Sequence, residues 1–187
     1  KKFTSLLFVL ALTLVIVTPV YAQTATRSGK LNREEFRARL SAIRDAKKKA
    51  IIERVDKRIG EINTNRTAIM LRHLTKIEEI LGRIEARTNT VAASGKDITT
   101  VKTAITTARA AIAAARTAMN VQVAKTYTIN ITTEANLGSA VSEVRKPFAS
   151  DLLAAHKTIV TARKSVRDVL VALGKVVGEK LSDTSEK

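Results

Sequence analysis

The sequence predicts an all-α protein, an elongated antiparallel three-helix or four-helix bundle of coiled-coil character with a long N-terminal helix. Apolar residues recur at alternating intervals of four and three, which is the spacing of one helix face. Only two prolines and seven glycines interrupt 187 residues, too few for a protein made of many strands and turns. Aromatic residues make up only 3%, so the side chains are thin enough for helices to pack closely.

The N-terminus has the layout of a secretory signal peptide. Lys1 and Lys2 precede a nearly unbroken apolar run over residues 3–17, and Val20 and Ala22 supply the small residues of a cleavage site. An uncleaved membrane anchor is the alternative, but the run is shorter than the roughly 20 residues that span a bilayer. We expect residues 1–22 to be removed by cleavage after Ala22, and the protein to be exported to the periplasm, the cell surface or the medium.

A flexible polar leader is expected over residues 23–31, and a basic amphipathic helix over 32–62. Gly60 and the run Asn63-Thr64-Asn65 predict a kink or a turn where this helix ends. The apolar stripe of the helix shifts in phase once and consists of Phe36, Leu40 and Ile43, followed by Ile51, Val55, Ile59 and Ile62.

Residues 63–181 are expected to form the bundle, with helices over about 63–92, 97–126 and 134–180 and a polar tail over 182–187. The segment from Tyr127 to Thr133 is rich in β-branched residues and reads as an extended connection. The last helix would then start level with residue 63 and overhang the bundle by about 16 residues. The stripe of 32–60 would lack a cover unless the chain folds back at 60–65, giving four helices, or a second copy covers it in a homo-oligomer.

The charge balance points to acidic partners. The chain carries 33 lysines and arginines against 17 acidic residues, a net charge of +16. An anionic envelope polymer or lipid surface fits a basic amphipathic helix, whereas nucleic acid is disfavoured because no aromatic stacking platform accompanies the charge. The alternative is that these are solvated helix faces. Two basic clusters are candidates for polyanion docking: Arg44, Lys47, Lys48, Lys49, Arg54, Lys57 and Arg58, and Lys157, Arg163, Lys164, Arg167 and Lys175.

Catalytic chemistry is poorly supported. The chain has no cysteine, which excludes thiolate nucleophiles and thiolate zinc sites, and only two histidines, His73 and His156, too few ligands for a metal site. Glu78 and Glu79 point about 100° apart on a helix and cannot form a dyad. We expect no enzyme activity, cofactor, metal or small-molecule substrate. The function predicted is a structural or interaction protein, with a periplasmic holdase-type chaperone as the alternative.

The stretch from about Leu74 to Leu173 resembles uncharacterised secreted helical proteins of small-genome, candidate-phylum bacteria. The residues that carry the likeness are Ile84-Glu85-Ala86-Arg87, the Ala-rich middle helix and the connection from Ala124 to Thr133. This group has no assigned activity, so the resemblance implies a fold and no site. Cationic periplasmic chaperones are similar in charge and helicity, but their Leu-Thr-x-x-Gln motif is replaced here by Leu74-Thr75-Lys76-Ile77-Glu78.

Overall fold

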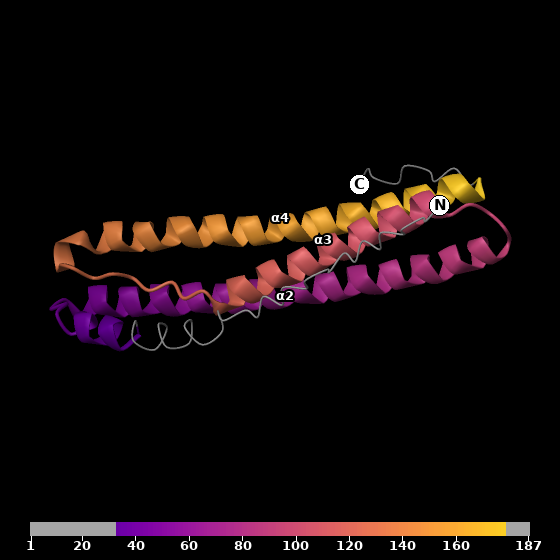
Figure 1. Cartoon of the computed structure of the whole chain (residues 1–187). Helices are drawn as coiled ribbons and strands as arrows, with labels where there is room; N and C mark the ends of the chain where they lie inside the picture. The colour runs from indigo at the N-terminus through magenta and orange to yellow at the C-terminus, as the bar shows by residue number, and fades with distance from the viewer. Residues whose placement is uncertain (1–32, 179–187) are drawn as a thin grey trace, which may run out of the picture.

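The computed structural model describes residues 33–178, and over this range the chain is an elongated all-helical bundle without strands (Figure 1). Three long helices form it: α2 (Ala46–Ala93), α3 (Thr99–Ala124) and α4 (Leu137–Val177). A short helical segment over 33–40 precedes α2, and the 3-10 helix η1 (Glu134–Asn136) precedes α4. The predicted fold class is confirmed. The signal peptide, the leader and the polar tail fall outside the described residues.

The helix predicted over 32–62 is interrupted at residues 41–45, and its second part continues beyond residue 62. The helical turns end at residue 40, and Ser41, Ala42 and Ile43 donate backbone bonds of 3.1–3.3 Å to residues three positions earlier. A new helix, α2, then starts after Asp45, whose carboxylate accepts from the backbone N–H groups of Lys47 and Lys48. Asp45 thus caps the N–H groups at the start of α2, and this capping role was not predicted from the sequence.

No turn ends the helix at Gly60–Asn65, because α2 continues through this stretch without interruption. Of the residues that suggested a helix break, Asn63 is buried at a core position, whereas Thr64 and Asn65 are exposed on the helix surface. The stripe also differs in phase from the expectation, since Ile52 is buried while Ile51 is 55% exposed. From Met70 onward the buried positions alternate by four and three, as the spacing predicts, and Asn63 and Thr67 extend this series toward the start of α2; the predicted positions are Met70, Leu74, Ile77, Leu81, Ile84 and Thr88.

The connection over residues 125–133 is extended, as predicted, and it decides where α4 begins. Figure 1 shows it running from the end of α3 back along α2, to the end of the bundle where α2 starts. Nine extended residues reach about 30 Å, which covers the roughly 26 Å that a helix rises over seventeen residues, from 46 to 63. α4 therefore starts level with the beginning of α2, where Glu134 Oε2 accepts from the backbone N–H of Arg44 at 3.0 Å.

The predicted overhang of the last helix is therefore absent. At the far end Lys96 Nζ, in the α2–α3 loop, donates to the carbonyl of Val176 at 3.1 Å, so α4 ends level with the end of α2. α4 stops at Val177, because Gly178 takes a left-handed φ of 87° and its N–H bonds the Gly174 carbonyl. The expected helix to residue 180 ends three residues early for this reason.

Two apolar cores hold the bundle together, and the smaller one covers the stripe that was expected to lack a partner. In the larger core α2, α3 and α4 interlock from Met70 to Leu173. In the smaller core the extended connection takes the place of a third helix, and its Ile129 is completely buried. Because the chain itself covers the apolar stripe of residues 32–60, this stripe no longer argues for a dimer. The smaller core consists of Phe36, Leu40, Ile43, Ile52, Ile129, Ile131, Leu137 and Ala140.

Candidate functional site

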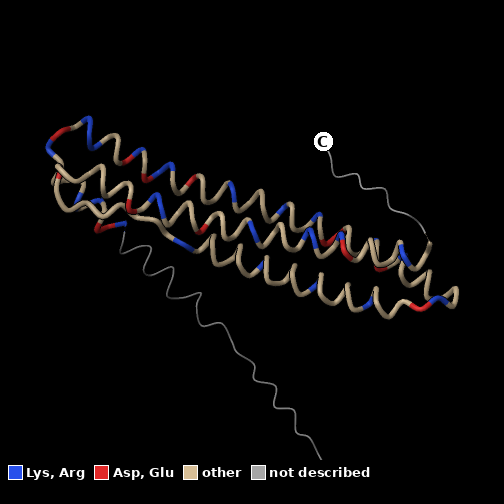
Figure 2. The backbone as a smooth tube through the Cα atoms, turned by 90° about the horizontal axis from the view of Figure 1, so that it is seen from above, with Lys and Arg blue, Asp and Glu red and all other residues tan. Residues whose placement is uncertain are grey.

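The two predicted polyanion-docking clusters lie in opposite halves of the bundle. The first lies at the amino-terminal end of α2 and the second on the carboxyl-terminal half of α4, while Figure 2 shows Lys and Arg along the whole length of the molecule. Because α2 and α4 start together, Lys157 stands about 30 Å along the axis from the level of Lys48. No small ligand can contact both clusters at once, so each is considered separately.

Ion pairs partly neutralise the first cluster. Lys48 Nζ lies 3.0 Å from Glu134 Oε1, and the hydrogen bond from Lys48 is the main cause that lowers the pKa of the Glu134 carboxyl. Lys57 and Arg58 share Glu61 at 3.8 and 3.7 Å. The contact of Lys48 with Glu134 joins α2 to the start of α4, so this lysine has a structural role. Arg44, Lys47, Lys49 and Arg54 complete the cluster, with only Lys49 half-buried.

The second cluster lies on a helix face that also exposes large apolar side chains. The core positions of this half of α4 include Ala155, Ile159 and Val166, and residues such as Lys164 stand about 180° away from them. On that outward side Leu153 is 55% exposed, Val160 52% and Val171 37%. We call this surface the α4 outer ridge and define it as Leu153, Lys157, Val160, Lys164, Val171 and Lys175.

The apolar members of the α4 outer ridge are what the sequence reading missed. The intervals of four and three predict the core positions of this helix. A second series with the same intervals, at residues 153, 157, 160 and 164, runs along the opposite side of the helix. Arg163 and Arg167 flank the ridge, and Arg167 is engaged with a partner of its own. Asp168 is the single acidic residue between residues 152 and 177. The ridge therefore combines an excess of positive charge with exposed aliphatic side chains.

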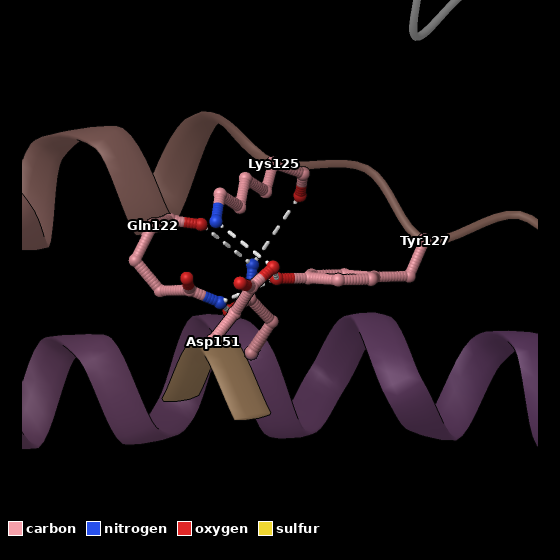
Figure 3. Close-up of polar contacts among 5 residues, drawn as sticks. Gln122, Lys125, Tyr127 and Asp151 are labelled. Atoms are coloured by element: carbon pink, nitrogen blue, oxygen red, sulfur yellow. Dashed lines mark hydrogen bonds and ion pairs between the residues drawn. The ribbon is translucent and has the colours of Figure 1, made fainter. Parts of the chain in front are cut away.

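A buried polar node joins the three helices where α3 ends (Figure 3). Asn63 of α2 donates to the Gln122 carbonyl at 3.1 Å, and Gln122 Nε2 donates in return to Asn63 Oδ1 at 2.9 Å. Gln122 Nε2 also lies 2.9 Å from the Tyr127 hydroxyl, which donates to Asp151 Oδ2 at 2.8 Å. Lys125 completes the node with a 2.8 Å ion pair to the same carboxylate oxygen.

The contacts of the node hold Tyr127 protonated and Asp151 ionised near neutral pH. Burial, helped by the bond to Asp151, raises the pKa of Tyr127 to about 12, so the phenol stays protonated. The hydrogen bond from Lys125 is the largest cause that lowers the pKa of Asp151, so this carboxylate stays ionised. The ring of Tyr127 also contacts Phe148 edge-on at 5.0 Å. The node thus fixes the point at which the helix α3 gives way to the extended connection.

Two carboxylates of α2 accept hydrogen bonds from arginines of α3. Arg109 donates to the Glu85 carboxylate at 2.7 and 2.8 Å, and Arg116 donates to the Glu78 carboxylate at 2.6 and 2.7 Å. The bond from Arg109 is the first cause that lowers the pKa of Glu85. Glu78 is therefore committed to a helix–helix contact. Among residues 33–178 no group of three or more His, Asp or Glu side chains could hold a metal ion.

Comparison of this chain with protein-family models, curated proteins and solved structures gives no match. The resemblance to secreted helical proteins of candidate-phylum bacteria therefore stays a prediction. Within the part of the chain that the structure describes, no helix combines the length and the hydropathy needed to cross a bilayer.

Proposed function

We propose that this protein is a non-enzymatic, exported helical interaction protein that attaches to anionic components of the cell envelope. The α4 outer ridge is the observation that supports this proposal best. Its three lysines, Lys157, Lys164 and Lys175, are exposed, and Asp168 is the only acidic residue on this half of the helix. A row of like charges on a stiff rod suits a flat or polymeric anion better than a small molecule.

The first cluster supports the proposal less, because ion pairs already engage part of it. Lys48 is held by Glu134, and Lys57 and Arg58 share Glu61. An external anion at this end would compete with these carboxylates. The attachment surface is therefore assigned to α4, with the amino-terminal end of α2 as a natural control.

Binding of the chain from Gln23 to Lys187 to isolated envelopes tests the proposal. Attachment at low salt and release at high salt are expected, because exposed charge contacts are screened over about 8 Å at physiological ionic strength. Replacing the three ridge lysines by glutamine should shift release to lower salt. A control with the same change in charge should behave as the unchanged chain: Lys47→Gln, Lys49→Gln and Arg54→Gln. A chain that stays soluble at low salt, or a control that weakens binding as much as the ridge variant, would overturn the proposal.

A periplasmic holdase-type chaperone is the second candidate, favoured by exposed aliphatic side chains beyond the ridge. Val121 and Val123, near the end of α3, are 53% and 52% exposed, and such surface beside positive charge can hold unfolded chains. Slower aggregation of a chemically denatured client at equal molarity is the expected result. A client that aggregates at the same rate with and without the protein would remove this candidate.

A further inference from the structure

The aliphatic side chains of the α4 outer ridge are unusually concentrated for a solvated helix face. Leu153, Val160 and Val171, with the neighbouring Leu170, are four of the nine large apolar residues that the described part of the chain leaves exposed. From residue 153 to residue 175 the ridge follows one uninterrupted helix for about 33 Å. Exposed apolar side chains gathered on one face of a helix mark a candidate binding surface.

Lysines and aliphatic side chains alternate along the ridge, and this alternation distinguishes between the possible kinds of anionic partner. A soluble polyanion would contact the lysines and leave the aliphatic side chains in water. A partner helix packed as a coiled coil would need apolar residues along the whole stripe, whereas Lys157 and Lys164 occupy alternate positions of it. A bilayer surface accepts both kinds of residue, because aliphatic side chains enter the acyl boundary while lysines extend to the phosphates.

We infer that α4 lies along the surface of an anionic lipid bilayer, with Leu153, Val160 and Val171 inserted below the headgroups and Lys157, Lys164 and Lys175 bound to lipid phosphates. The inference rests on the proposed attachment to the envelope and names its anionic component. α4 is then parallel to the membrane plane. Insertion needs no spanning helix, because the buried face of α4 remains packed in the bundle.

Vesicle binding by three variants of the chain from Gln23 to Lys187 separates lipid insertion from charge attraction. Sedimentation with vesicles of phosphatidylcholine, with and without phosphatidylglycerol, measures binding. The insertion variant replaces Leu153, Val160 and Val171 by serine, and the charge variant replaces the three ridge lysines by glutamine. Both should bind phosphatidylglycerol vesicles at least tenfold more weakly than the unchanged chain. A matched control should bind normally, since its exposed apolar residues lie off the ridge: Ile51→Ser, Val121→Ser and Val123→Ser.

Depth of insertion can be read directly, because the chain contains no cysteine. A single Val160→Cys labelled with an environment-sensitive fluorophore should shift to the blue on phosphatidylglycerol vesicles and be quenched by lipids brominated on their acyl chains. The same label at Val123→Cys should show neither change.

The outcomes distinguish the inference from the proposed function. Unchanged vesicle binding by the insertion variant, or an unshifted label at position 160, overturns lipid insertion while electrostatic attachment to another envelope anion stands. Unchanged binding of both vesicles and envelopes by the charge variant overturns both. Far-UV circular dichroism of each variant shows that the bundle is intact, which is expected because the substituted side chains are exposed.

Discussion

Replacing Asn63 by alanine should destabilise the bundle more than replacing an exposed residue of α2 by alanine. Asn63 is 5% exposed and Gln122 2%, and two hydrogen bonds of 3.1 and 2.9 Å join them across α2 and α3. A buried hydrogen bond contributes about 0.5–1.5 kcal/mol, and a buried group left unpaired costs about 1–3 kcal/mol. The alanine variant also loses the 3.4 Å bond from Asn63 Nδ2 to the Lys125 carbonyl. The loss of these three bonds should lower the free energy of unfolding by about 2–3 kcal/mol.

A double-mutant cycle isolates the contact itself. Gln122→Leu should cost a similar amount, because it removes the shared bond and the one between Gln122 Nε2 and the Tyr127 hydroxyl. The hydroxyl keeps Asp151 as its acceptor. The double variant should then be more stable than the sum of the single effects predicts, by about 1–2 kcal/mol, since the shared bond is lost only once.

Urea unfolding followed by far-UV circular dichroism measures these differences. In a chain of this size about 2–3 kcal/mol corresponds to a fall in Tm of about 5–10 °C. Asn65→Ala, an exposed change on the same helix, should lie within about 0.5 kcal/mol of the unchanged chain. Single variants as stable as this control, or effects that add without coupling, would refute the role given to the node.

Three further predictions concern the node, the extended connection and two glycines. Tyr127 is the only tyrosine after residue 22 and the chain has no tryptophan, so ultraviolet titration of the chain from Gln23 should show ionisation near pH 12 instead of 10. Since the folded pKa is raised above the unfolded value, the stability due to the protonated phenol is complete below about pH 10 and falls as pH rises toward 12. Tyr127→Phe should remove this contribution to the loss of stability at alkaline pH. Ionisation of Tyr127 near pH 10 would contradict the prediction. Ile129→Ala should cost about 2–4 kcal/mol in urea unfolding, because the side chain is completely buried in the smaller core, and a loss below 1 kcal/mol would mean that the connection does not cover α2. Gly82→Ala should raise the free energy of unfolding by about 0.5–1 kcal/mol, since a Cβ there meets nothing within 4 Å, whereas Gly95→Ala should lower it because Gly95 has a φ of 83°; equal effects at the two glycines would contradict this reasoning.

The helical character and the main heptad could be predicted from residue order alone. Met70, Leu74, Ile77 and Leu81 are buried where the 4–3 spacing placed them. Such spacing is a local property, since any helix with that stripe must bury it. The extended connection was predicted on the same ground, because a run of β-branched residues disfavours a helix locally.

The sequence analysis did not place the polar residues Asn63 and Gln122 in the core, because the partner of each lies far away in the chain. Asn63 was interpreted as part of a helix break, yet its partner Gln122 lies 59 positions further on. Both residues continue the heptad registers of their helices, Asn63 before Thr67 and Met70, and Gln122 after Met119. Following those registers outward would have placed both side chains in the core, while their mutual contact depends on how α2 and α3 pack.

The sequence by itself determined an all-helical chain, its main apolar stripes and its excess of positive charge, since these follow from composition and local periodicity. Only the tertiary structure decided the register of α4. That register follows from the roughly 30 Å reach of an extended connection, which carries α4 back to the start of α2 and covers the stripe around Ile52. It also decided which apolar residues remain in water, because the face of α4 that carries Leu153 and Val160 is outward only once α2 and α3 occupy the other side.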